Sequence, residues 1–280
     1  MHGNRKLKVK QSILIFIRLF SLLQGGACLL LKIAFTFGKL EVTDNLDLIF
    51  NGTPLHPQSR KLNDLAKVLM DPTITDGRSG DTILYKMYRE AILDKHYDLF
   101  TKNILRFDIT IMAPIVLGEE LNKTLGHSHP EAAAGLSYPE IYQVLYGNAC
   151  FLLQKLEKGK LIEFKVIEAD AGDAVVIPPN YGHVSVNRGD MPLVLANLVS
   201  GNFTPIYGDY LSKRGAAYYM LKGNRMVPNP SYGSPPLPIF SKERYPISND
   251  LYTDFISDPR SYAFLNDPTK LGKATFVDNR

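Results

Sequence analysis

Residues 123–142 read KTLGHSHPEAAAGLSYPEIY and place His127 and His129 one residue apart. In an extended strand, side chains at positions i and i+2 point to the same face, so the two imidazoles are expected to lie side by side. Glu140 follows after an insert that contains Gly and Pro. The pattern predicts two imidazoles and one carboxylate that enter a common interior from neighbouring strands.

A second stretch, residues 172–187, carries His183 just after a Pro-Pro turn. The predicted ligands, which can each donate one nitrogen or oxygen atom, are His127, His129, Glu140 and His183. Such a mixed set suits a divalent transition metal, and we expect one ion per subunit, iron(II) first, with nickel, manganese or zinc as alternatives. Glu131 lies closer in sequence to the histidine pair and is an alternative carboxylate ligand.

The segments around these motifs predict a mostly β protein. From residue 104 onward, short β-forming runs each end at Gly, Pro, Asn or a charged pair. EKGK at 157–160 predicts a hairpin turn. Several short strands at this spacing are typical of an all-β sandwich or barrel. A short surface helix is expected at 59–70, and another short helix near 250–256.

The spacing of these residues resembles the two motifs of the cupin superfamily, G(X)5HXH(X)3–4E(X)6G and G(X)5PXG(X)2H(X)3N. Gly147 follows Glu140 at the distance of the first motif. The positions that match the second motif are Gly172, Pro178, His183 and Asn187. The resemblance implies a cupin double-stranded β-helix, a jelly-roll barrel, with a few peripheral helices.

The match to the cupin motifs has three departures. The insert between His129 and Glu140 has ten residues, and Leu121 stands where the first motif has glycine. Asn180 replaces a turn glycine, a change that the fold can accept because Asn tolerates left-handed backbone better than most residues.

Longer stretches resemble the cupin-type glucose-6-phosphate isomerases of archaea and some bacteria. They include RFDITIMAP, LNKTLGHSHPE, YPEIYQVLYG, IPPNYGHVSVNRGD and PIYGDY, and the resemblance covers roughly 45–225. It implies a homodimeric, metal-dependent aldose–ketose isomerase that interconverts glucose 6-phosphate and fructose 6-phosphate in glycolysis and gluconeogenesis.

Residue by residue, the resemblance assigns roles to positions in this chain. The four predicted ligands match the metal ligands of the family. The residues that it places at the substrate are Thr110, Thr124 and Gly126 for the phosphate, and Tyr142 and Tyr207 for the sugar. Lys123 could add charge beside the phosphate. Pro205 stands where some members carry a histidine considered for ring opening, so that role cannot apply here.

The expected catalytic residues are Glu140 and Tyr142. Isomerisation moves one proton between C1 and C2 through a cis-enediol, and a carboxylate such as Glu140 is a plausible shuttle. A bound metal would stabilise the enediolate charge as a Lewis acid. A metal-assisted hydride shift is the competing mechanism, and the sequence does not separate the two.

Two other functions are compatible with this ligand set. One is a non-haem iron dioxygenase of the cupin superfamily, which would need a more apolar pocket and no phosphate site. The other is a non-catalytic sugar-phosphate-binding cupin. Tyr85 and Tyr88 could also reach the sugar, although packing is favoured for them.

The ends of the chain differ from its middle. Residues 1–40 contain seven basic residues and no acidic one, so the overall charge of +4 leaves −3 for the remainder and no basic bias toward nucleic acid. We expect residues 1–44 to form an apolar and basic extension, 45–225 the cupin isomerase domain, and 226–280 an extension wrapped over the barrel. A membrane contact is expected only if residues 12–37 are an anchor; a signal or a start-site artefact are alternatives. Two cysteines without a disulfide framework favour a cytoplasmic location.

Overall fold

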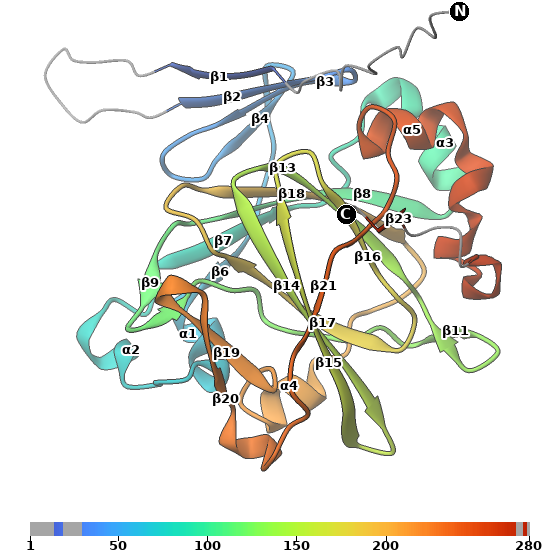
Figure 1. Cartoon of the computed structure of the whole chain (residues 1–280). Helices are drawn as coiled ribbons and strands as arrows, with labels where there is room; N and C mark the ends of the chain where they lie inside the picture. Colours follow the sequence, from blue (N-terminus) through green and yellow to red (C-terminus); the bar gives the residue numbers. More distant parts are fainter. Residues whose placement is uncertain (1–13, 19–29, 273–276, 279–280) are drawn as a thin grey trace, which may run out of the picture.

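The computed structural model describes residues 14–18, 30–272 and 277–278 (Figure 1). Two β-sheets form the centre of the molecule. Across the first, the strands are in the order β16 (Ala174–Ile177), β13 (Glu140–Tyr146), β18 (Leu193–Ser200), β8 (Leu105–Met112), β7 (Ile83–Tyr88) and β6 (Gln58–Lys61). Across the second, they are β17 (Tyr181–Asn187), β14 (Asn148–Glu157), β15 (Lys160–Asp170) and β21 (Ile239–Ser241).

Apolar side chains from both sheets pack against each other inside the barrel. Val144 and Leu195 from the first sheet meet Phe151 and Leu153 from the second. This arrangement confirms the predicted mostly β cupin barrel. The hairpin predicted at EKGK is also confirmed, since it joins β14 to β15 with Lys158 and Gly159 at positive φ.

The outer face of the first sheet is buried as well. Phe107 and Ile109 of β8 belong to an apolar cluster that includes Tyr252 and Phe255 of α5 (Leu251–Ser257). Side chains of β8 therefore alternate between an outer apolar layer and the barrel interior. Helix α5 confirms the short helix predicted near 250–256.

The N-terminal sheet packs into the same outer cluster. Its strands, in order, are β1 (Leu14–Arg18), β2 (Leu30–Phe35), β3 (Gly38–Val42), β4 (Leu48–Phe50) and β5 (Thr53–Pro54). Because β3 pairs with β4, the sheet crosses the boundary proposed at residue 44, and Leu40 and Leu48 are fully buried. Part of the candidate anchor 12–37 lies outside the described residues, and its described parts contain β1 and β2. Among the described residues, no helix has the length and apolar character needed to cross a membrane.

Smaller elements close the barrel and cover the second sheet. The remaining strands are β9 (Val116–Leu117), β10 (Glu120–Leu121), β11 (Glu131–Ala133), β12 (Leu136–Ser137), β19 (Tyr218–Leu221), β20 (Arg225–Pro228), β22 (Glu243–Arg244) and β23 (Val277–Asp278). The remaining α-helices are α1 (Leu62–Leu65), α2 (Ile74–Gly77), α3 (Tyr97–Lys102) and α4 (Gly208–Ser212). Short 3-10 helices lie at 66–68, 94–96, 222–224, 230–232, 259–265 and 268–270.

The helix predicted on the surface at 59–70 is only partly present. Ser59 belongs to β6, and α1 is a single turn that continues into the 3-10 turn 66–68. Leu62, Leu65 and Leu69 are fully buried and pack in the cluster inside the barrel. Their helical spacing therefore closes the barrel interior and does not form a surface face.

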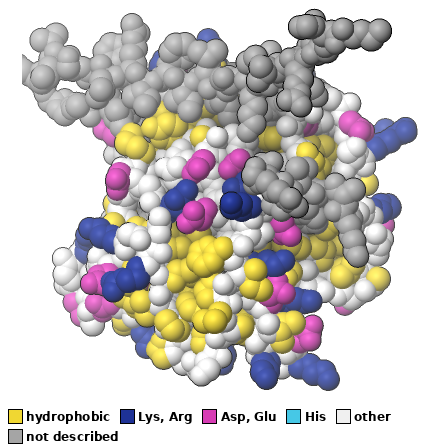
Figure 2. Space-filling model, viewed as in Figure 1, with side chains coloured by type: hydrophobic (Ala, Val, Ile, Leu, Met, Phe, Trp, Pro, Cys, Tyr) yellow, Lys and Arg dark blue, Asp and Glu magenta, His cyan; other side chains and the backbone are white. Residues whose placement is uncertain are grey.

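The described part of residues 226–280 lies along the outside of the barrel. Strand β21 pairs in parallel with β15 at the edge of the second sheet. Leu237, Ile239 and Phe240 are 83%, 50% and 68% exposed there. Figure 2 shows hydrophobic side chains gathered in the middle of this face, where β21 runs in Figure 1.

Candidate metal centre

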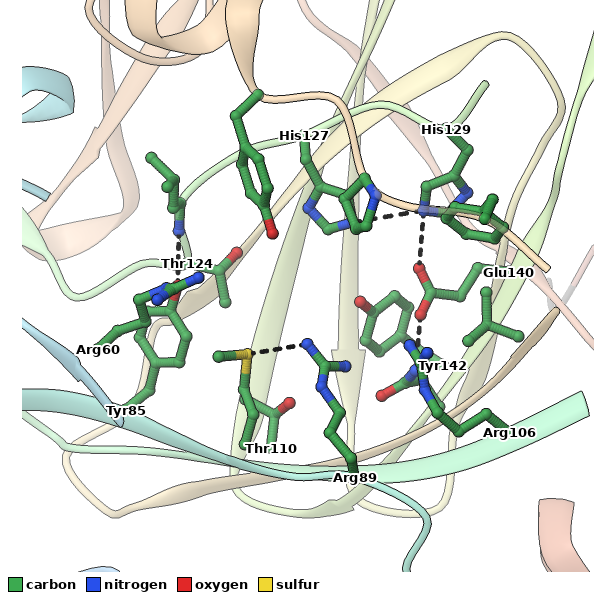
Figure 3. Close-up of a pocket in the computed structure, with 17 residues that line it drawn as sticks. Arg60, Tyr85, Arg89, Arg106, Thr110, Thr124, His127, His129, Glu140 and Tyr142 are labelled. Carbon is green, nitrogen blue, oxygen red and sulfur yellow. Dashed lines mark hydrogen bonds and ion pairs between the residues drawn. The ribbon is translucent and has the colours of Figure 1, made fainter. Parts of the chain in front are cut away.

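One face of the first sheet carries most of the polar side chains of the barrel interior. Cross-strand pairing aligns Tyr142 with Asn197 and Asn197 with Asp108. Two residues further along each strand, Glu140 pairs with Val199, and Val199 pairs with Arg106. Because alternate residues share a face, these side chains all enter the interior of the barrel. All of them except Asp108 line the cavity shown in Figure 3.

The segment with the two histidines runs beside β17 as an irregular extended strand. His127 and His183 form an antiparallel bridge in which each amide donates to the other's carbonyl, at 3.2 and 2.9 Å. This pairing brings the first motif against the second. The imidazoles of His127 and His129 project into the cavity, as their spacing predicts, with ring centroids 5.2 Å apart.

The four predicted metal ligands converge on one point. Their donor atoms all lie within 4.8 Å of one another. Oε2 of Glu140 lies 3.5 Å from Nε2 of His129 and 3.4 Å from Nε2 of His183. The structure thus brings together the whole ligand set expected from the sequence.

Neighbouring groups orient these ligands. Nδ1 of His129 is hydrogen-bonded to the carbonyl of Tyr138 at 2.8 Å, which leaves Nε2 with its lone pair toward the centre. Asn197 Nδ2 donates to Oε1 of Glu140 at 2.7 Å, whereas Oε2 is buried without a hydrogen-bond partner. A buried carboxylate oxygen without a partner is costly. The donor set and this oxygen therefore fit a divalent cation.

Burial sets the protonation of the centre. It lowers the pKa of His127 to about 3, with a further contribution from His129, and the pKa of His129 to about 4. It also lowers the pKa of His183 well below its ordinary value. Burial, with Asp108 second, raises the pKa of Glu140 to about 8. At neutral pH the imidazoles are thus neutral ligands, while the metal-free carboxyl group retains its proton.

From this protonation state we predict how the apparent affinity for a metal depends on pH. Below pH 8 a cation must displace the Glu140 proton, so the apparent affinity should fall about tenfold per pH unit from pH 8 to pH 5. Above pH 8 the affinity should level off. Calorimetric metal titrations in buffers of different ionisation enthalpy should detect one released proton at pH 6.5. Glu140→Gln should abolish this release, whereas an affinity independent of pH would contradict the assignment.

Two of the three residues predicted at the substrate phosphate lie at the other end of the cavity. Thr110 and Thr124 both line it, together with Tyr85 and Arg60. The Thr124 hydroxyl accepts a hydrogen bond from the Ser185 amide at 2.9 Å and donates a long one to the Ser185 carbonyl at 3.5 Å. Tyr85 packs in the apolar cluster inside the barrel, as favoured from the sequence, and it also lines the cavity, where its hydroxyl accepts from the Leu125 amide at 3.1 Å.

Both tyrosines expected at the sugar lie in the cavity wall. Tyr142 and Tyr207 line the cavity, as does Pro205. The Tyr142 hydroxyl lies 3.2 Å from Nε2 of His183, at the edge of the metal centre. Tyr88 packs in the outer cluster, as predicted, and donates its hydroxyl hydrogen to the carbonyl of Leu46.

Three of the residues considered from the sequence lie elsewhere. Lys123 points away from the cavity, is 5% exposed and pairs with Glu120, so it does not add charge at the phosphate. Glu131 lies on the exposed β11–β12 hairpin and accepts from the Gly135 amide, which removes it as a ligand. Gly126 lies against Tyr210, and a Cβ there would come within 2.2 Å of the ring.

Several cavity residues were not predicted. The cavity side chains missed from the sequence are Arg60, Met87, Arg89, Arg106, Leu125, Asn197, Val199 and Phe203. Arg89 follows Tyr85 and Met87 at a spacing of two residues, and Arg106 lies four residues before Thr110. Because side chains two residues apart in a strand share a face, this spacing is the signal that could have identified the two arginines.

Comparisons with known proteins agree with this geometry. The family model "Glucose-6-phosphate isomerase (GPI)" matches residues 59–235. Glucose-6-phosphate isomerase of Thermococcus litoralis is 27% identical over 60% of this chain and 82% of that protein. The enzyme of the same name from Pyrococcus abyssi is 28% identical over 62% and 87%. A putative glucose-6-phosphate isomerase of Rhizobium meliloti is 30% identical over 49% and 58%.

Solved structures show only a distant likeness. A structure of Bacillus subtilis oxalate decarboxylase covers 44% of this chain and 28% of that chain with 19% identity and a TM-score of 0.32. The assignment of the site therefore depends on the sequence relatives and on the geometry of the residues themselves.

Proposed function

The chain belongs to the glucose-6-phosphate isomerase family, and we propose that it interconverts glucose 6-phosphate and fructose 6-phosphate at the centre formed by His127, His129, Glu140 and His183. The single observation that carries the proposal is the convergence of four donor atoms at one end of a cavity whose other end offers donors for a phosphate. The reaction is an intramolecular transfer of hydrogen between two carbons of one sugar.

The wall of the cavity supports a phosphorylated substrate. The Thr124 hydroxyl donates only a long hydrogen bond, 3.5 Å to the Ser185 carbonyl, so it can turn its proton to a charged phosphate oxygen, which is a stronger acceptor. Arg60 adds a permanent positive charge at the same end. An aldose phosphate bound this way would direct its C1 and C2 toward Glu140.

Glu140 is the residue that we assign to proton transfer. Its Oε1 is fixed by Asn197, and its Oε2 faces the centre of the four ligands. The carboxylate would take a proton from C2 and return it to C1 through a cis-enediol. Tyr142, buried beside His183, would hold a sugar hydroxyl. When bound, a divalent metal supplies Lewis-acid stabilisation of the negative charge that develops on the sugar oxygens.

Replacement of Thr124 by valine tests the phosphate end. A lost hydrogen bond to a charged group costs roughly 1.5–3 kcal/mol, so KM for the sugar phosphate should rise roughly 10- to 100-fold. Metal content should stay that of the unmodified protein. Thr124→Ser keeps the hydroxyl and is the matched control, expected to retain most of the affinity. Equal loss of metal and substrate binding in the valine variant would instead assign Thr124 to the structure.

The decisive experiment is an isomerase assay on the full chain after removal of metal and reloading with iron(II), nickel, manganese or zinc. Formation of fructose 6-phosphate that depends on metal is the expected result. Oxygen uptake without isomerisation would favour a dioxygenase, although three arginines on the wall do not suit an apolar substrate. Tight binding of the sugar phosphate without turnover in any metal would identify a non-catalytic binding protein.

Three finer assignments belong to the same proposal. We propose iron(II) as the resident ion, because the ligands are imidazole nitrogens and one carboxylate oxygen. We propose a homodimer, supported by the exposed apolar side chains along β21. We propose a cytoplasmic location, supported by Cys150, which is buried without a disulfide. Metal analysis of the purified protein, sedimentation and fractionation of cells test them in turn.

A further inference from the structure

Two arginines at the metal end of the cavity share one buried carboxylate. Asp108 is fully buried, and its Oδ2 accepts from Nη1 of Arg89 at 2.6 Å. Nε of Arg106 donates to both oxygens of Asp108, at 2.9 and 2.7 Å. The backbone amide of Glu90 donates to Oδ1 at 3.0 Å. Because Asp108 is held from three sides, it fixes the orientation of both guanidinium groups.

The free sides of these guanidinium groups face the cavity. Both arginines line it, with side chains 32% and 25% exposed, while Asp108 lies behind them. Arg89 also donates to the sulfur of Met87 at 3.4 Å, a weak acceptor. Among the described residues, the Nη groups of Arg106 have no hydrogen-bond partner. The pair therefore presents unused, strongly directional donors to the interior.

The charges in this cluster do not cancel. Two guanidinium groups face one aspartate, and the nearby Glu140 is held by Asn197 instead of by either arginine. Burial opposes the charge of Arg89, but Asp108 raises the pKa of Arg89 above its ordinary value, so the group remains a cation. A partly buried positive charge in excess is stable only if an anion or water completes it. The two arginines therefore form a site that can bind an anion.

The position of this charge distinguishes it from the phosphate end. Figure 3 shows Arg60 with Tyr85 and Thr124 at one side of the cavity and Arg106 with Glu140 and His129 at the other, with Arg89 between them. The electrostatic influence of Arg89 reaches Glu140 and Tyr142, and that of Arg106 reaches His129. The two ends therefore carry separate cationic groups.

We propose that Arg89 and Arg106, fixed by Asp108, form a second anion subsite that binds the sugar oxygens at C1 and C2 when they carry negative charge. The ligand class is a short carbon chain with a phosphate at one end and a carboxylate or enediolate at the other. Both guanidinium groups contact these oxygens, and Asp108 is the positioning residue that orients them. The inference rests on the proposed function, because that function places the phosphate at Arg60 and Thr124.

This subsite would favour the reaction over simple binding. The sugar is neutral at C1 and C2 in the ground state, whereas the enediolate is anionic. A preorganised guanidinium stabilises only the second of these, which lowers the barrier without tightening substrate binding. Arg89→Met should therefore lower kcat more than it raises KM.

Binding of two phosphorylated analogues to the metal-loaded full chain tests the proposal. The first, 6-phosphogluconate, carries a carboxylate at C1; the second, glucitol 6-phosphate, carries a neutral hydroxyl there. We expect unmodified protein to bind the first more tightly by calorimetry. Arg89→Met should reduce the ratio of the two affinities roughly 10- to 100-fold, because it removes hydrogen bonds to a charged group. Arg89→Lys, which keeps the charge, should retain part of the ratio.

Arg60→Met is the matched control at the other end of the cavity. It should weaken both analogues by a similar factor, since both carry the phosphate. An unchanged ratio in Arg89→Met, with unchanged metal content, would overturn the subsite. Equal weakening of both analogues by Arg89→Met would also overturn it. If unmodified protein shows no isomerase activity in any metal, the proposed function fails, yet the affinity ratio still decides whether the subsite exists.

Discussion

Replacement of His183 by alanine is expected to abolish isomerase activity and to remove most of the bound metal. His183 is 1% exposed and places Nε2 within 3.4 Å of the unpaired Glu140 oxygen, so no water or neighbouring side chain can take its place without rearrangement. Changes to groups that merely orient a metal ligand cost 10- to 100-fold, so loss of a ligand should cost at least about 100-fold. Elemental analysis and the isomerase assay measure the two effects.

His56→Ala is the matched control for this experiment. His56 is exposed and lies between β5 and β6, outside the cavity. Its replacement should change neither metal content nor activity. Circular dichroism should show that the His183 variant remains folded. Full activity together with normal metal content in a folded His183 variant would remove it from the centre and contradict the proposed function.

Glu140→Gln is expected to lower kcat by about 10²- to 10⁴-fold, the usual contribution of a general acid–base group. Glutamine has the same shape and can still accept the hydrogen bond from Asn197, but it cannot carry a proton between two carbons. The variant should therefore be assayed at saturating metal, because the loss of one negative charge also weakens metal binding. Residual binding of glucitol 6-phosphate would show that the cavity persists.

The fate of hydrogen at C2 separates the two mechanisms. Substrate labelled with deuterium at C2 should lose part of its label to water in unmodified protein if Glu140 carries a proton. Complete transfer of the label to C1 would contradict the shuttle and favour the hydride shift. Glu131→Gln is the control, since this exposed carboxylate of β11 should affect neither label nor rate.

The sequence was sufficient to identify the four candidate ligands because strand alternation and motif spacing depend only on residues that are near one another along the chain. His127 and His129 share a face through strand alternation, and their distances to Glu140 and His183 along the chain match a known pair of motifs. The turn at Lys158 and Gly159 and the helix α5 are local in the same sense, and both were predicted. The barrel itself followed from the number and spacing of short strands.

Asn180 shows where local reasoning was incomplete. Its positive φ of 68° agrees with the expectation that asparagine can replace a turn glycine. Its side-chain oxygen also accepts a hydrogen bond from the backbone amide of Ser137 at 2.9 Å. The backbone amide of Asn180 in turn donates to the Ser137 hydroxyl at 2.7 Å. These bonds attach the long insert to the barrel. Two of the three departures from the motifs, the long insert and Asn180, are thus linked by a contact that the sequence does not display.

Only the tertiary structure decided which side chains surround the centre. Arg89 and Asp108 are separated by a helix and a strand boundary, and they meet because Met87 pairs with Thr110 across β7 and β8. The register between distant strands depends on packing over both faces of a sheet, so no short sequence pattern encodes it. Lys123 forms a bridge with Val186 of β17, and its side chain pairs with Glu120 outside the cavity. Residue types and local spacing therefore determined the metal ligands, whereas long-range strand pairing determined the charge around them.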